Sequence, residues 1–184
     1  ELRNKLKINE TSVQSPQWII GGSGGYSIDL SQHVWVDSLQ FEALWDVARI
    51  HEANGEYSMA FKSFRKGIEL YKGDFLDEDR YEEWSLIRRE RLLDIYLSML
   101  DRLADYCYGM KDFTGCIQYS QKLLEKDKCQ ELAYQKIIKA CLETGQKTRA
   151  LRWYEICKDI LYSELDCDVS DDTFNLVRSI SKVA

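Results

Sequence analysis

The sequence predicts an all-α fold built as a stack of antiparallel helical hairpins, and three observations support this. A short turn-and-small-residue motif occurs at residues 55–60, 111–116 and 145–150. Apolar residues recur at helical spacing from residue 41 onward. The single proline, Pro16, lies near the start, so the rest of the chain contains no strong helix breaker of this kind.

The spacing of the motif copies indicates the type of repeat. The last two copies start at positions 111 and 145, which is one period of the tetratricopeptide repeat (TPR), a pair of helices. The first two start at positions 55 and 111, farther apart than one period, so an insertion, placed at residues 73–94, interrupts the array. We therefore expect a TPR-like alpha–alpha superhelix. Such arrays present a concave surface lined by the first helix of each pair, which favours recognition over catalysis.

The apolar stripes place the helices in order along the chain. They run over residues 41–48, 57–71, 92–107, 113–124, 134–141 and 150–161. The first helix begins after Asp37 or Ser38 as N-cap. The third is expected from about 81 to 108, roughly 40 Å long. A short last helix begins after Ser170 as its N-cap, with two aspartates facing the positive end of its dipole.

The repeated motif has a steric purpose. Five residues after each turn position stands a small side chain, which lets the second helix approach the first closely. These side chains are Ala60, Cys116 and Ala150. The turn position is Gly55 or Gly145 in two copies, and glycine supplies the positive φ of a helix C-terminus. In the middle copy Lys111 stands there, so either the turn differs or Lys111 bears strain.

The charge distribution limits the partners. A net charge of −6 and a pI near 5.1 argue against the whole chain being a nucleic-acid-binding surface. Residues 74–83 hold six carboxylates against Arg80 alone. This stretch lacks the glycine and terminal ligand of an EF-hand, so calcium is not expected. It is either a site for a basic partner or, in the favoured interpretation, a solvated loop.

The cysteines and histidines predict neither a metal nor a cofactor. The six cysteines show no C-x-x-C spacing, and only His33 and His51 could assist them. Four cysteines fall on apolar helix faces, where a free thiol acts as a small hydrophobe. We therefore expect this protein to reside in a reducing compartment, where its thiols stay free. No apolar run approaches the length that a membrane-spanning helix needs and no signal peptide precedes Glu1, so we expect a cytoplasmic protein with no membrane partner.

Residues 1–36 follow a different pattern. Two short β-prone runs, residues 18–20 and 26–28, flank the glycine cluster 21–25 and predict a β-hairpin. A glycine-rich loop can also cradle phosphate, but neither G-x-G-x-x-G nor a Walker A lysine is present, so the hairpin is favoured.

The basic stretch at residues 2–7, followed by this hairpin, resembles the end of an OmpR-type winged-helix DNA-binding domain. In that fold the basic stretch ends the recognition helix and a glycine-tyrosine hairpin forms the wing. The resemblance implies DNA contacts in the intact protein from Arg3, Asn4, Lys5 and Lys7. A solvated helix end is the alternative for these residues. The sequence starts inside the recognition helix, so we expect the regulatory half of a longer transcription factor.

The remaining sequence resembles the bacterial transcriptional activator domain of antibiotic-regulatory-type activators. The resemblance covers residues 34–182 and depends on the order of several modest motifs. These are residues 34–37, 41–44, 71–76, Trp84, 91–92, 150–151, Tyr154 and 164–165. It implies two parts: residues 1–36 as a C-terminal winged-helix remnant with its connector, and residues 37–184 as a TPR-like activator domain.

The function expected from this resemblance is that of a regulatory, protein-interaction domain in a DNA-binding transcriptional regulator. The partner would be the transcription machinery or the chain's own DNA-binding domain, and a homodimer is a further option. A generic TPR adaptor that binds a peptide or helix in its concave face is the alternative. No catalytic constellation is recognised, so an enzyme is not expected.

The insertion supplies the predicted partner contacts, because it mixes aromatic anchors with charge. The candidates are Phe75, Asp77, Glu78, Asp79 and Tyr81. Alternatively, these aromatics cap the core of the first hairpin. His51 is expected to be packed and hydrogen-bonded rather than a general base. Trp84 and Trp153 are expected in the core, and anchoring a ligand in a groove is the alternative for both.

Overall fold

The computed structural model describes residues 19–22, 25–28, 35–77 and 83–181. The chain forms two compact units, Glu1–Val36 and Asp37–Ala184. In the first unit, strands β1 (Ile19–Gly22) and β2 (Gly25–Ile28) pair antiparallel. The assignment of this unit to a winged helix stays a prediction.

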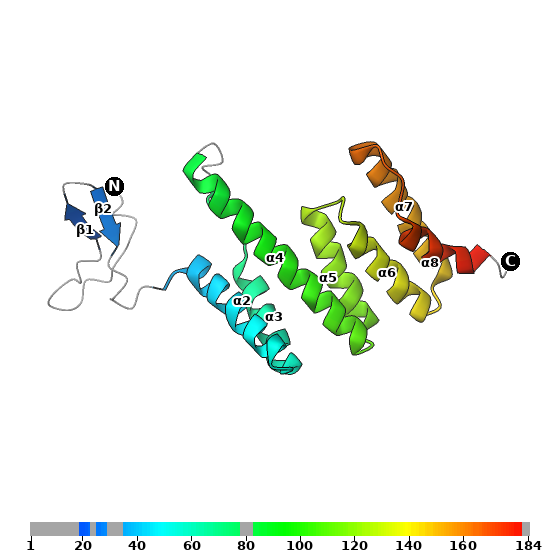
Figure 1. Cartoon of the computed structure of the whole chain (residues 1–184), viewed down its shortest axis with the longest axis horizontal. Coiled ribbons are helices and arrows are strands. Elements are labelled where there is room, and N and C mark those ends of the chain that lie inside the picture. Colours follow the sequence, from blue (N-terminus) through cyan, green and yellow to red (C-terminus); the bar gives the residue numbers. More distant parts are fainter. Residues whose placement is uncertain (1–18, 23–24, 29–34, 78–82, 182–184) are drawn as a thin grey trace. The chain divides into compact units, whose positions relative to one another are not determined.

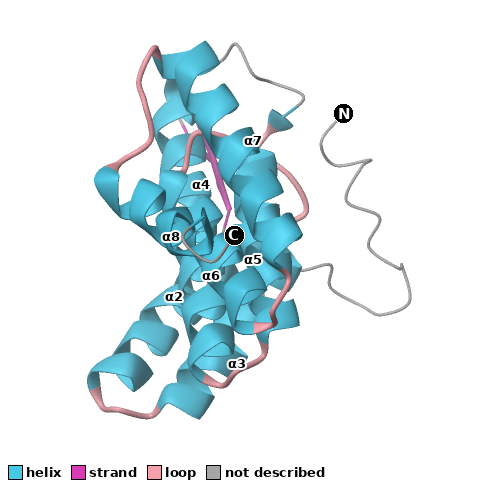
Figure 2. Ribbon diagram, turned by 90° about the vertical axis from the view of Figure 1, so that its right-hand side faces the viewer, coloured by secondary structure: helices cyan, strands magenta, loops and turns pink. Residues whose placement is uncertain are grey.

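The second unit is a stack of helices, which we call the helical domain (Figure 1). Its helices are α2 (Asp37–Ala53), α3 (Tyr57–Leu70), α4 (Glu83–Gly109), α5 (Phe113–Lys126), α6 (Glu131–Glu143), α7 (Lys147–Leu165) and α8 (Asp171–Ser181). Each helix packs against the next one along the chain. A second view shows that helices make up this unit, with loops between them (Figure 2). The predicted all-helical stack is confirmed.

The helices pair into hairpins with the predicted phase. α2–α3, α4–α5 and α6–α7 are each joined by a tight turn, and the first helices α2, α4 and α6 also contact one another in order. α8 packs on α6 and α7, the position that the first helix of a fourth hairpin would take.

The insertion forms both a loop and an extension of a helix. Residues 71–82, which we call the connector, join α3 to α4, and α4 has 27 residues where α6 has 13. α5, with 14 residues, spans only about 21 Å against roughly 40 Å for α4. The first half of α4 therefore extends beyond its hairpin partner and packs instead on the first hairpin and the connector.

The three hairpin turns share one hydrogen-bond pattern. In each, the turn residue donates its N–H to the carbonyl three residues earlier at 2.9–3.0 Å, and the next residue donates to the carbonyl five residues earlier at 2.8 Å. This is the Schellman motif, which needs a left-handed residue at the turn. Gly55 and Gly145 have φ of +75° and +71°, and Lys111 has +60°. The middle turn is therefore the same, and Lys111 bears the strain.

Exchanging side chains at the turn position isolates this strain. We expect Lys111→Gly to raise the free energy of unfolding by about 0.5–1 kcal/mol, because glycine lacks the Cβ that disfavours positive φ. Gly145→Ala should lower it by about 1 kcal/mol. A Cβ at Gly145 would meet no heavy atom within 4 Å, so the effect there is conformational alone. Urea unfolding measures both, and changes of the same sign would contradict the strain.

The core forms where the repeated motif predicts it. Ala60, Cys116 and Ala150 have no exposed surface, which confirms the close approach of the paired helices. Four of the cysteines, at 107, 116, 141 and 157, are buried as predicted, and all six thiols are free. Burial raises the pKa of the Cys116 thiol to about 11, so this thiol stays protonated near neutral pH.

Three apolar residues, two of them in the predicted helical stripes and one predicted in the core, are exposed instead. Val47 and Tyr57 are 43% and 60% exposed, and the Tyr57 ring lies 6.0 Å from that of Tyr106 on α4. Trp84 is 67% exposed, so its placement in the core is wrong: it lies in the part of α4 that extends beyond α5. Trp153 is half-buried, with its ring centroid 6.1 Å from that of Tyr134.

Candidate functional site

The connector brings part of the predicted partner-contact set to one place. Phe75 is half-buried and Asp77 is exposed, and both line a single pocket. The other predicted contacts lie outside the described residues and stay predictions. These are Glu78, Asp79 and Tyr81 in the connector and Arg3, Asn4, Lys5 and Lys7 in the first unit.

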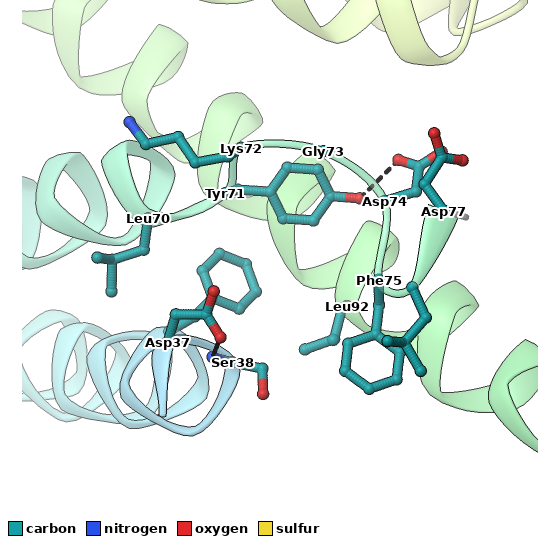
Figure 3. Close-up of a pocket in the computed structure, with 12 residues that line it drawn as sticks. Asp37, Ser38, Leu70, Tyr71, Lys72, Gly73, Asp74, Phe75, Asp77 and Leu92 are labelled. Atoms are coloured by element: carbon teal, nitrogen blue, oxygen red, sulfur yellow. Dashed lines mark hydrogen bonds between the residues drawn. The ribbon is translucent and has the colours of Figure 1, made fainter. Parts of the chain in front are cut away.

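The pocket has a volume of about 510 Å³ and lies entirely within the helical domain (Figure 3). The start of α2, the end of α3, the connector and α4 form its walls. Its apolar lining includes Phe41 and Leu92, each only 3% exposed, together with the half-buried Leu70 and Phe75. A volume and lining of this kind are typical of sites that accept a ligand group.

The mouth of the pocket is polar and mainly acidic. Asp37 and Ser38 begin α2 on one side, and Asp74 and Asp77 stand in the connector on the other. In Figure 3 the side chains of Asp74 and Asp77 lie at the connector end of the pocket, whereas the side chain of Lys72 extends in the opposite direction.

A buried arginine fixes the connector over α4. Arg89 is 9% exposed, and its Nε donates to the carbonyl oxygen of Phe75 at 2.9 Å. Its Nη2 donates to the carbonyl oxygen of Leu76 at 3.2 Å and to Ser85 Oγ at 3.1 Å. Leu76 has φ of +50°, a strained value for leucine. The guanidinium therefore holds the loop in a conformation that the loop alone would disfavour.

A second network joins the connector to α5. Asp74 accepts a hydrogen bond from the Tyr71 hydroxyl at 3.0 Å and pairs with Lys126 Nζ at 2.7 Å. Burial, together with the hydrogen bond to Asp74, raises the pKa of Tyr71 above its ordinary value. The Tyr71 ring stacks on that of Tyr96, with centroids 4.1 Å apart. Tyr71 thus remains a protonated donor to Asp74 while its ring packs the start of the connector against α4.

Ion pairs between α2 and α4 fix these two helical walls of the pocket relative to each other. Arg88 donates through both terminal nitrogens to the two carboxylate oxygens of Glu42, with Nη1 2.9 Å from Oε1. Arg91 Nε lies 3.1 Å from Glu42 Oε1. The Glu42 side chain is only 14% exposed, so solvent screens this cluster less than a surface pair.

Polar contacts also link the first helices along the rest of the stack. Glu52 of α2 accepts a hydrogen bond from Tyr106 of α4. Lys136 of α6 pairs with Asp101 at 2.7 Å and Asp105 at 2.6 Å, both on α4. These contacts tie the first helices to one another along the stack.

The last such contact docks α8 onto α6. The Glu131 carboxylate accepts hydrogen bonds from the backbone N–H and the hydroxyl of Ser170, each at 2.7 Å, and from the Thr173 hydroxyl. Ser170 Oγ accepts from the Thr173 N–H at 3.4 Å, which confirms Ser170 as the N-cap of α8. Burial by itself would raise the pKa of Glu131, but these hydrogen bonds outweigh it and lower the pKa below its ordinary value.

This docking should depend on pH. Because the folded pKa of Glu131 is depressed, its stabilising contribution is present above the unfolded pKa, near 4.5, and is lost as pH falls through the folded value. We expect Glu131→Gln to speed amide exchange in α8 at pH 7, and the difference from the unmodified chain to shrink in acid. Hydrogen exchange read by mass spectrometry measures both. A difference that grows toward low pH would contradict this role.

The prediction that His51 is hydrogen-bonded is confirmed. His51 Nδ1 lies 2.5 Å from Glu56 Oε2, across the first hairpin turn, so the ring is hydrogen-bonded as expected. His33 lies outside the described residues. Among the residues that the structure describes, no group of three or more His, Cys, Asp or Glu side chains is arranged to hold a metal ion.

Sequence reasoning missed the residues that shape the pocket. Arg89, Lys126 and Glu42 were not singled out, since charged side chains on helices usually face solvent. Spacing contained a signal for one of them: Arg89 stands three residues before the buried Leu92 and four after the buried Ser85, on the inner side of α4.

These features define the class of protein, a TPR-like helical-repeat domain with an enlarged connection after its first hairpin. Residues 36–181 match the family model described as the bacterial transcriptional activator domain. The chain therefore belongs to the bacterial transcriptional activator domain family. The match begins at residue 36, so it does not include the paired strands of the first unit.

A solved structure shares the fold at low sequence identity. The C-terminal TPR-containing domain of a putative FK506-binding protein from Plasmodium falciparum aligns with a TM-score of 0.57 and 15% identity, covering 82% of this chain and 97% of that one. The first TPR of Spaghetti (RPAP3), bound to an HSP90 peptide, aligns with a TM-score of 0.49 and 18% identity, covering 80% and 95%. Among curated proteins, none matches significantly.

Membrane-spanning character is absent from the helices of the described region. None of them is both long enough and apolar enough to cross a bilayer.

Proposed function

We propose that the helical domain is the regulatory, protein-interaction part of a cytoplasmic DNA-binding transcriptional regulator. The observation that carries this proposal is the match of residues 36–181 to the bacterial transcriptional activator domain family. The linked first helices and the pocket support an interaction role, because both offer a surface that is already formed on folding.

We further propose that residues 1–36 end a winged-helix DNA-binding domain. The resemblance of residues 2–7 to the end of a recognition helix supports this assignment, as does the pairing of β1 with β2, joined by only two residues, at the position of the wing. Arg3, Asn4, Lys5 and Lys7 would then contact DNA, chiefly its phosphates, a sequence-independent and salt-dependent contribution. Homodimerisation would match a two-fold symmetric operator.

The connector is the proposed contact for the transcription machinery or for the DNA-binding domain. Phe75 and Asp77 line a pocket in a segment that the repeat period does not require. Glu78, Asp79 and Tyr81 would extend the same contact.

Charge reversal tests this proposal in the full-length regulator. We expect Asp77→Lys, Glu78→Lys and Asp79→Lys together to reduce transcription from a reporter promoter severalfold, while the helical circular dichroism signal stays intact. A matched control reverses Glu155 and Asp159, exposed acidic residues of α7 far along the chain from the connector. Equal activation by the connector variant and the control would show that the connector carboxylates face solvent and contact no partner.

The alternative function is that of a generic TPR adaptor. The TPR-like fold is the one observation that supports it. Promoter binding distinguishes the two. A full-length regulator should bind its promoter DNA with an affinity that falls steeply with salt, whereas an adaptor should show no such binding.

A further inference from the structure

We infer that the first half of α4 docks an amphipathic helix of a partner protein, one that carries a lysine beside its apolar face. The inference deepens the proposed function and rests on it in one respect, namely that the helical domain contacts another protein. The surface lies along α4, and none of the described residues that form it lines the connector pocket.

α4 presents this surface because it is much longer than its hairpin partner. Within the described part of the chain, α5 leaves about 20 Å of α4 without a paired helix (Figure 1). A stretch of this length accommodates a partner helix of roughly three to four turns.

One side of this half of α4, which we call the α4 stripe, combines exposed apolar and acidic side chains. Its members follow helical spacing and are Leu86, Ile87, Glu90, Leu93, Asp94 and Leu97. Ile87 is 81% exposed and Leu86 is 49% exposed, and Leu93 and Leu97 are half-buried. Covering such a row of aliphatic side chains with the apolar face of another helix is favourable.

The second half of α4 shows how its own neighbours cover the continuation of this stripe. There the stripe continues through Asp101, Ala104 and Asp105, and α5 and α6 pack against α4. Lys136 of α6 pairs with Asp101 at 2.7 Å and with Asp105 at 2.6 Å, and its side chain is only 17% exposed. Two carboxylates four residues apart on α4 therefore hold one lysine of a packed helix.

Glu90 and Asp94 repeat this arrangement nearer the start of α4. They are also four residues apart, and they precede Asp101 and Asp105 by about three helical turns, which brings them to nearly the same side of the helix. Both side chains are exposed, and no lysine or arginine among the described residues pairs with either of them. The partner helix supplies this lysine in the proposed complex.

The arginines of this half of α4 do not take the place of that lysine. Arg88 and Arg91 pair with Glu42 of α2. Arg89 is buried, and it donates hydrogen bonds to carbonyl oxygens of the connector. The two carboxylates of the α4 stripe therefore favour a cation from outside the domain.

The charges and the apolar side chains of the α4 stripe together define one occupant. A helix with lysine next to leucine or isoleucine matches both features, as α6 does with Lys136 and the fully buried Ile137. An acidic helix would meet Glu90 and Asp94 as like charges, which disfavours it.

The test uses the full 184-residue chain and three synthetic peptides. The first is acetyl-Ala-Leu-Ala-Lys-Leu-Leu-Ala-Lys-Leu-Leu-Ala-Lys-Leu-Ala-amide, the second has glutamate for each lysine, and the third has alanine for each leucine. NMR titration of the backbone amides should show saturable shifts at Ile87, Glu90 and Asp94 with the first peptide. We expect no saturable shift with the glutamate peptide. The alanine peptide should bind on the order of tenfold more weakly, because apolar anchors dominate such contacts.

Two pairs of variants locate the site. Glu90→Gln with Asp94→Asn should weaken binding of the first peptide severalfold. The matched control, Glu155→Gln with Asp159→Asn, changes an exposed pair of the same spacing on α7 and should leave binding unchanged. Ile87→Ser should weaken binding on the order of tenfold, whereas Ile50→Ser, at an exposed isoleucine of α2, should not. All these side chains are exposed, so the helical circular dichroism signal should stay intact in each variant.

Several results would overturn the inference. Equal affinity for the lysine and glutamate peptides would exclude a basic partner helix. Shifts on another face of the domain, or binding that neither α4 variant weakens, would exclude this surface. Sedimentation of the chain alone as a dimer that Ile87→Ser dissociates would make a second copy the occupant instead. If charge reversal in the connector reduces reporter transcription and the peptides give any of these results, the proposed function stands and this inference fails.

Discussion

Replacing Arg89 with methionine is expected to lower the free energy of unfolding by about 2–4 kcal/mol. The substitution leaves two backbone carbonyls of the connector and the Ser85 hydroxyl without the donors that Arg89 provides. Hydrogen bonds from a charged donor are each worth about 1.5–3 kcal/mol, and methionine fills only part of the space. Urea unfolding measures the loss, and amide exchange at residues 73–77 should rise more than elsewhere in the domain.

Arg91→Met is the matched control for this experiment. Its side chain is 67% exposed and makes one ion pair with Glu42, so its removal should cost less than about 1 kcal/mol. Equal losses for the two variants would show that burial of the guanidinium is not what stabilises the connector.

Replacing Ala150 with leucine is expected to lower the free energy of unfolding by about 1–3 kcal/mol. Ala150 has no exposed surface and lies in the cluster that contains Ile138 and Cys141 of α6. Three further carbon atoms there must push α7 away from α6 or force strained rotamers. Arg152→Leu introduces the same side chain at an exposed position two residues on, and should change stability by less than about 0.5 kcal/mol. A similar effect of both substitutions would contradict the steric role of the small residue.

The stack was predictable from the sequence because it depends on local, repeated requirements. A positive φ at residues 55, 111 and 145 and a small side chain five residues later recur in each hairpin, so the sequence shows them as a period. Helix boundaries followed from the apolar stripes: α4 was expected from about 81 to 108 and is Glu83–Gly109.

The placement of Trp84 was not predictable for a physical reason. Helical spacing shows which residues share a face, but not how far the neighbouring helix extends along it. α5 ends before it reaches the first half of α4, so an aromatic residue that spacing assigns to the core lies in solvent.

The pocket was predictable only in part. The insertion and its aromatic and acidic residues mark the connector in the sequence, and Phe75 and Asp77 do line the pocket. Its other walls come from α2 and α4, which the connector meets through contacts between residues far apart in the chain. The hydrogen bond from Arg89 to the Phe75 carbonyl is one, and the pairing of Asp74 with Lys126 similarly ties the connector to α5. Such pairings depend on the arrangement of whole helices, which periodicity does not specify.

The length of α4 has a consequence for how the domain unfolds. In a regular array each repeat is coupled only to its neighbours, so one end can melt while the other persists. α4 contacts α2 and α3 on one side and α5 and α6 on the other, and therefore belongs to the interfaces of both hairpins at once. Loss of the first hairpin strips the first half of α4 of its packing, and a helix of that length in water is only marginally stable. The coupling free energy at this junction should thus exceed that between α5 and α6, and the first two hairpins should melt as one cooperative unit.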